Sequence, residues 1–198
     1  RSTLVARVDP SLCVSCGICA GSCAPMGVGP EGRTGRDQLA EAKAFVAESS
    51  PEGVVIVGCD RSAVGPAAEL HGASVFPVTC AGNLHTSVVE YLVRSGVPGV
   101  LIVACPERDC WSREGPKWLE QRLYHEREAE LQDRVDRRRI RVVHRAAGEA
   151  RELAEQLGWF RADIDRLERT DAETEIDLIA ACETDDGVAV SALPGGTS

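Results

Sequence analysis

The chain has 198 residues, of which 43% are hydrophobic and 27% are charged, a composition typical of a globular protein. Its net charge of -9 argues against a nucleic-acid partner. No apolar run approaches the roughly 18 to 20 residues of a membrane span, and the first residues lack the apolar core of a signal peptide. We therefore expect a cytoplasmic protein, or one held at the cytoplasmic face of a membrane only through a partner or an upstream segment.

The nine cysteines form two groups of four and one single residue. Disulfides are typical of small secreted domains that lack a sufficient core, whereas this chain is long enough to bury one and shows no export signal. Reduced thiols that hold metal are therefore the better interpretation. The lone Cys182 is interpreted as a structural cysteine, since cysteines are often buried. The two groups are Cys13, Cys16, Cys19 and Cys23, and then Cys59, Cys80, Cys105 and Cys110.

The first group lies in the run "LCVSCGICAGSCAP", residues 12–25, with the spacing C-x2-C-x2-C-x3-C. This run resembles the bacterial ferredoxin motif for a 4Fe-4S cluster. Its two-residue spacings let the backbone curl around a cluster corner while N–H groups point at the sulfurs. Proline normally follows the fourth cysteine directly, whereas here Ala24 stands before Pro25. Residues 1–36 are thus predicted to be a ferredoxin-like 4Fe-4S segment followed by a linker.

The four cysteines of this run do not supply all four ligands of one cluster. In ferredoxins with two clusters, the first three cysteines hold one cluster and the fourth reaches the other. By that resemblance Cys13, Cys16 and Cys19 need a fourth thiolate, and Cys23 belongs to a neighbouring cluster. No second four-cysteine run occurs between residues 27 and 198. We therefore expect the partner run upstream of Arg1.

Apolar runs and helical patterns alternate in the rest of the chain. The runs are rich in β-branched residues and lack polar alternation, which is typical of buried parallel strands. Residues 37–169 are therefore predicted to form an α/β domain, an open parallel sheet of about four strands with helices on both faces. Residues 170–198 are expected to form an acidic, partly disordered tail. The expected strands span 53–59, 73–80, 99–105 and 139–145, and the expected helices span 37–49, 86–96, 117–134 and 148–160.

Three of the later cysteines occupy the same place, directly after an apolar run. Cys59 follows "VVIVG", Cys80 follows "VFPVT" and Cys105 follows "VLIVA". The carboxyl ends of parallel strands lie along one edge of a sheet, where such folds bind ligands. Together with Cys110, which closes the loop "CPERDC", four thiolates can converge at this edge.

The residues alone leave several uses for these thiols open. Four sulfurs could hold zinc, although structural zinc sites usually use short cysteine pairs and only one such pair is present. Four sulfurs could also hold an iron-sulfur cluster, since C-x4-C spacing occurs in plant-type 2Fe-2S sites. A reactive dithiol of Cys105 and Cys110 would leave the other two cysteines unexplained. Buried cysteines that merely end strands are a further interpretation. His85 is either an alternative ligand or a surface histidine at the start of a helix.

The stretch from about Val54 to Leu157 resembles the methyl-viologen-reducing hydrogenase delta-subunit family, also described as the hydrogenase iron-sulfur subunit. The resemblance rests on "VVIVGC", "PVTCAGNLHTSVVEYLVRSGVPGVLIVACPERDC" and "GPKWLEQRL". Family members often carry a second cysteine soon after the first, whereas this chain continues with "DRS". The resemblance implies a 2Fe-2S cluster with the ligands Cys59, Cys80, Cys105 and Cys110.

The predicted function is that of an electron-transfer subunit in a larger oxidoreductase complex. The resemblance implies a flavoprotein of heterodisulfide-reductase type and a hydrogenase as partners, and a membrane cytochrome b is a further candidate. No glycine-rich phosphate loop, flavin fingerprint or Ser/His/Asp grouping indicates substrate catalysis, so we expect catalysis on the partners. The alternatives are a dithiol redox enzyme that uses Cys105 and Cys110, and a zinc-stapled interaction module.

Overall fold

The computed structural model describes residues 8–64 and 72–185, with side chains described up to residue 175. Its contacts divide the chain into two compact units, Arg1–Arg161 and Ala162–Ser198. Both groups of four cysteines and the whole sheet belong to the first unit. Among the helices of the described ranges, none has the length and apolar character needed to cross a bilayer.

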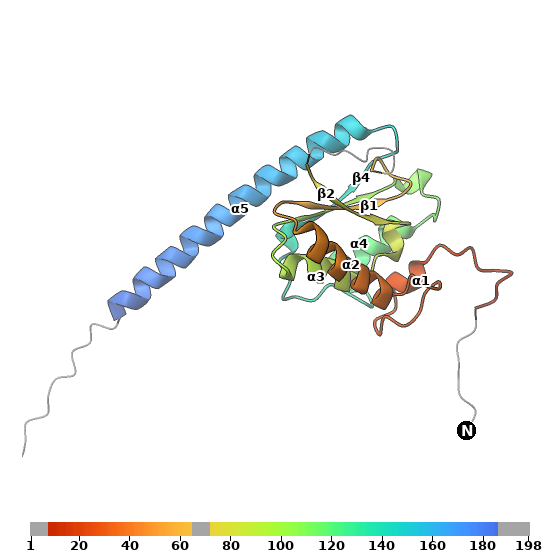
Figure 1. Ribbon diagram of the computed structural model, residues 1–198, viewed down its shortest axis with the longest axis horizontal. Helices are drawn as coiled ribbons and strands as arrows, with labels where there is room; N and C mark the ends of the chain where they lie inside the picture. Colours follow the sequence, from red (N-terminus) through yellow and green to blue (C-terminus); the bar gives the residue numbers. More distant parts are fainter. Residues whose placement is uncertain (1–7, 65–71, 186–198) are drawn as a thin grey trace, which may run out of the picture. The chain divides into compact units, whose positions relative to one another are not determined.

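A parallel sheet forms the centre of the first unit, with the strands β1 (Val55–Cys59), β2 (Ser74–Val78), β3 (Val100–Ala104) and β4 (Ile140–His144). The strand order is β2-β1-β3-β4, and every pair is parallel. Figure 1 shows the strands together, with α2 and α3 below them in this view. Every residue of β1 and β3 is buried, because these inner strands have helices on both faces. Each of the four predicted apolar runs contains one strand, which confirms the predicted α/β class.

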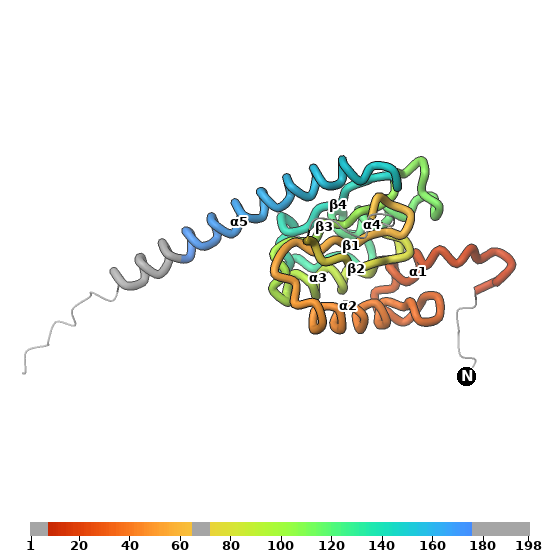
Figure 2. Tube along the Cα trace, turned by 45° about the horizontal axis from the view of Figure 1, so that its top comes forward, coloured from red at the N-terminus to blue at the C-terminus, as the bar shows by residue number. Residues whose placement is uncertain are grey.

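Helices cover the two faces of this sheet: α2 (Gly35–Ser49), α3 (Thr86–Arg94), α4 (Gly115–Tyr124) and the first turns of α5 (Ala150–Asp185). The short helix α1 (Ile18–Gly21) lies against α4 and the 3-10 turn η1 (Ala81–Asn83), and the other 3-10 turns are η2 (Glu107–Asp109) and η3 (Arg137–Arg139). Val57 and Ile102 face a core that includes apolar residues of α2, α3 and α4. The first turns of α5 lie on the opposite face, away from α2 and α3 (Figure 2). There the Arg141 guanidinium of β4 lies 4.8 Å from the centre of the Phe160 ring.

Helix α4 ends at Tyr124, well before the end of the predicted helix 117–134. Glu126 and Ala129 have positive φ angles of 51° and 59°, which a right-handed helix does not contain. The loop turns back, and its apolar residues Leu131 and Val135 are buried in the core. The prediction of one helix over 117–134 is therefore wrong, because apolar residues of a folded-back loop happened to have helical spacing.

Helix α5 is longer than the predicted helix 148–160 and continues to Asp185. Residues 170–185, which were expected to lie in the acidic tail, are thus helical. The side chains of residues 171–175 are exposed, which agrees with a segment that adds nothing to the core.

Phe160 tests the packing of α5 on the second face of the sheet. We expect Phe160→Ala to lower the free energy of unfolding by about 3 to 5 kcal/mol, because the ring is 0% exposed and its removal leaves a cavity. Its neighbour Trp159 is 60% exposed, so Trp159→Ala is a matched control that should cost about 0.5 kcal/mol or less. Urea unfolding followed by circular dichroism measures both. Equal losses would contradict this packing.

Candidate metal centre

The later cysteines lie where the strand order reverses. The chain goes from β1 to β2 on one side and then returns to place β3 on the other side of β1, so the switch point lies between β1 and β3. Cys59 is the last residue of β1, and Cys105 directly follows β3. Cys80 precedes η1, and Cys110 follows η2. All four thiols are free and buried.

One cavity of about 250 Å³ is lined by all four of these thiols. Cys16, from the first cysteine group, lines the same cavity. The rim includes Trp111, which directly follows Cys110 and whose side chain is 79% exposed. The Arg61 guanidinium lies 4.9 Å from the centre of the Trp111 ring. The structure therefore brings the later group together at the carboxyl edge and adds a thiol that the sequence did not place there.

Two thiols of this cavity, those of Cys80 and Cys105, are hard to ionise. Burial is the largest cause that raises the pKa of Cys80, while hydrogen bonds from Ser112 and from the Gly82 N–H, at 3.3 Å, oppose it. Burial also raises the pKa of Cys105 to about 12, and a hydrogen bond with Cys110 adds to this effect. Both groups are therefore protonated at neutral pH, and a bound metal has to displace their protons.

Three residues of the first cysteine group line a cavity that the fourth does not line. Cys13, Cys16 and Cys19 line a second cavity of about 590 Å³, together with several apolar side chains. Cys23 is not among the described residues that line it. This division has the same form as the ligand count of a two-cluster ferredoxin. Cys16 lines both cavities and so lies between the two groups.

The cysteines that the structure describes supply the kind of ligand that an iron-sulfur cluster needs, although they are not grouped around one position for a single metal ion. In the part of the chain that the structure describes, no three His, Cys, Asp or Glu side chains are grouped so that they could hold one metal ion. A two-iron cluster takes four thiolates shared between two metal atoms, and such soft ligands are those that iron-sulfur clusters use. Four buried thiols around one cavity fit that requirement.

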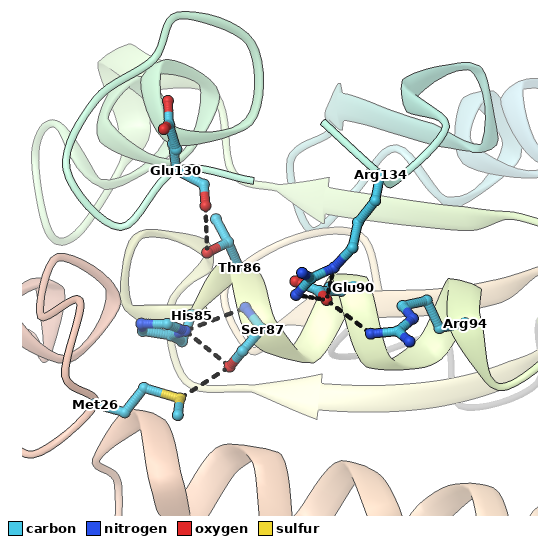
Figure 3. Close-up of polar contacts among 8 residues, drawn as sticks. All are labelled: Met26, His85, Thr86, Ser87, Glu90, Arg94, Glu130 and Arg134. Carbon is cyan, nitrogen blue, oxygen red and sulfur yellow. Dashed lines mark hydrogen bonds and ion pairs between the residues drawn. The ribbon is translucent and has the colours of Figure 1, made fainter. Parts of the chain in front are cut away.

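Polar contacts hold the segment after the first cysteines against α3 (Figure 3). The Met26 sulfur accepts a hydrogen bond from the Ser87 hydroxyl at 3.2 Å, and His85 Nδ1 accepts one from the Ser87 N–H at 3.1 Å. Because Nδ1 is the acceptor, Nε2 carries the proton and donates to the Cys23 carbonyl at 3.2 Å. Burial lowers the pKa of His85, which favours this neutral ring. His85 starts the helix as a buried residue with both nitrogens engaged, so the expectation of a surface histidine is wrong.

Two polar residues of this junction were not predicted from the sequence. The Gln38 side chain of α2 donates to the Asn83 carbonyl at 2.9 Å and accepts from the His85 N–H at 3.0 Å. Arg122 of α4 is fully buried and contacts both the first cysteine segment and η1. A signal for Arg122 was present, since it shares the apolar face of α4 with Leu119, and a charged residue on a buried face is unusual.

The fold and the cavity define an α/β domain that carries four buried cysteines at the carboxyl edge of its parallel sheet. The family model of the methyl-viologen-reducing hydrogenase delta subunit, FlpD, matches residues 57–168, more than half of the chain. The chain therefore belongs to this family of hydrogenase-associated subunits, which confirms the resemblance over that stretch. The match begins after the first cysteine group and does not cover the ferredoxin motif. No curated protein matches the sequence.

When the metal-free chain is alkylated under anaerobic conditions, buried cysteines should be labelled more slowly than exposed ones. We expect Cys13 and Cys19 to be labelled first, because both are exposed. A pKa raised from 9.0 to about 12 leaves Cys105 with little thiolate, so it should react roughly fiftyfold more slowly than a cysteine peptide at pH 8. Peptide mass mapping over time measures the order. Labelling of Cys105 as fast as Cys13 would contradict the buried arrangement.

Gly82 tests the close contact between η1 and α4. A Cβ at Gly82 would lie 2.4 Å from the Gly115 Cα, so backbone would have to move. We expect Gly82→Ala to lower the free energy of unfolding by about 1 to 3 kcal/mol. Gly53 has no atom within 4 Å of the corresponding position, and Gly53→Ala is the control, expected within about 0.5 kcal/mol of the wild type. Urea unfolding measures the free energy of unfolding of both variants, and similar losses in the two would contradict the close contact between η1 and α4.

Proposed function

We propose that the chain is the electron-transfer iron-sulfur subunit of a hydrogenase-associated oxidoreductase complex. The first cysteine group would hold a 4Fe-4S cluster, with Cys23 reaching a neighbouring one, and the later group would hold a 2Fe-2S cluster. The observation that carries this proposal is that Cys16 lines both cavities. When bound, the clusters take up and release single electrons without the making or breaking of covalent bonds.

The residues around the cavity supply what such a relay requires. Burial of the later thiols keeps water away from the sulfurs, and the low dielectric constant strengthens every charge interaction there. The Gly82 N–H points at the Cys80 sulfur from 3.3 Å and stabilises negative charge on it. Cys16 lines both cavities, so its side chain would lie between the two clusters on the route of the electron.

The partners in this proposal are other redox subunits: a flavoprotein, a hydrogenase or a cytochrome b. The clusters held by the two cysteine groups would pass an electron from the reduced cofactor of one partner to the oxidised cofactor of another, so substrate catalysis would lie on those partners. A cytoplasmic location, or one at the cytoplasmic face of a membrane through a partner, belongs to the same proposal, since reducing conditions keep the thiols available for metal.

Metal and sulfide analysis of the anaerobically purified chain tests the proposal. We expect roughly six iron atoms and six acid-labile sulfides per chain, and EPR signals after reduction. Zinc without sulfide would instead support the zinc-stapled module. Free thiols with little metal and no visible absorption would support a dithiol enzyme at Cys105 and Cys110.

Single cysteine variants assign the two clusters. Cys110→Ser should lose the 2Fe-2S signal and keep the other, whereas Cys19→Ser should do the opposite, because each removes a thiolate from one cavity only. Cys182→Ser, at the cysteine outside both groups, is the control and should keep both signals. EPR and iron content of the purified variants measure the result. Loss of the same signal in both variants would contradict two separate sites.

A further inference from the structure

Arg122 is the largest fully buried side chain in the described residues, with 0% of its surface exposed. Its Nη2 donates to the carbonyls of Gly82, at 2.9 Å, and Leu84, at 3.3 Å. Its Nη1 donates to the Ser22 hydroxyl at 3.3 Å. One guanidinium thus joins the loop after Cys80 to the segment of the first cysteine group.

No carboxylate balances this charge among the residues that the structure describes. The three hydrogen-bond partners are neutral oxygens, and the buried Nε has no partner in the same part of the chain. Burial, followed by repulsion from Arg127, lowers the pKa of Arg122 to about 10, so the group remains protonated at neutral pH. A buried charge is strongly unfavourable unless a group of opposite sign lies nearby.

The hydrogen bonds of Arg122 reach residues next to both cysteine groups. Gly82 links Arg122 to the later group, since its carbonyl accepts from Arg122 while its N–H donates to the Cys80 sulfur. A negative charge at Cys80 would attract Arg122, since it acts to raise the pKa of the guanidinium. In the first group, Ser22 immediately precedes Cys23. Anions held by either cysteine group would therefore meet the same guanidinium.

We propose that Arg122 is the shared counter-charge of the clusters held by the two cysteine groups, and that it raises their reduction potentials. The inference rests on the proposed function, because the negative charge comes from thiolates and cluster sulfides. Each added electron makes a cluster more negative, so a fixed positive charge stabilises the reduced form more than the oxidised form. Arg122 itself exchanges neither an electron nor a proton; the electron comes from the reduced cofactor of a partner subunit.

Redox titration of the loaded full chain, followed by EPR, tests this proposal in two variants. Arg122→Gln keeps a hydrogen-bond donor but removes the charge. At a fixed potential we expect its ratio of reduced to oxidised cluster to fall on the order of tenfold, which is about 59 mV for a one-electron couple. Arg122→Lys keeps the charge but loses the planar fork, and its ratio should stay within about threefold of the wild type.

Arg137→Gln is the matched control. Arg137 also donates to backbone carbonyls, those of Leu123 at 3.0 Å and Leu131 at 2.9 Å, but its charge is paired with Asp133 at 3.2 Å. Its removal should leave both potentials unchanged. A loaded Arg122→Gln chain that titrates like the wild type, or an equal shift in Arg122→Lys, overturns the proposal and leaves the proposed function intact. A wild-type chain without iron and sulfide overturns the proposed function instead.

Cluster loading of the two variants, with thermal unfolding as the measure of the fold, decides the case in which Arg122→Gln does not take up clusters. Both variants lose the planar fork that bonds Ser22, Gly82 and Leu84, so both metal-free chains should unfold at similar temperatures, below that of the wild type. Arg122→Lys keeps the charge and should still take up clusters; equal failure of both variants to take them up would mean that Arg122 only ties backbone carbonyls together, and it would overturn the proposal.

Discussion

The loop that follows Cys80 is the junction on which the arrangement of both cysteine groups depends. Gly82 directs its N–H to the Cys80 sulfur and its carbonyl to Arg122, and the next carbonyl, of Asn83, accepts from Gln38. The loop also packs so tightly against α4 that no side chain fits at Gly82. Because α2 and α4 bond directly to these few backbone groups, and Ser22 of the first cysteine segment is joined to them through Arg122, a shift of the loop would change both cavities together.

The parallel topology explains why the loop lies where it does. Strand β2 ends beside β1, and both end at the edge where β3 delivers Cys105. This much could be predicted from the sequence, because buried apolar runs followed by cysteine identify the strands and their carboxyl ends. The convergence of Cys59, Cys80 and Cys105 then follows from the geometry of any parallel sheet. Only the strand order, which sets β1 and β3 as neighbours, had to come from the structure.

The remaining parts of the site depend on contacts between distant residues, which local patterns do not encode. Nothing in the spacing of the first cysteine run indicates that Cys16 borders the later thiols. The burial of His85 depends on Cys23 and Gln38, and both lie far from it in the sequence. The end of α4 was missed for a related reason, since Leu131 is buried by a loop that turns back rather than by a continuing helix.

Two unfavourable features of the metal-free chain have opposite signs. The thiols of Cys80 and Cys105 are buried so that their ionised form is disfavoured, and Arg122 is buried so that its charged form is disfavoured. The proposed anionic cluster would relieve both at once, because metal would replace the thiol protons and the negative charge would compensate the guanidinium. Natural sequences keep such local conflicts mainly at functional sites. Under the proposed function we therefore expect cluster loading and folding of this unit to be coupled, most strongly at the loop where Cys80 and Arg122 share Gly82.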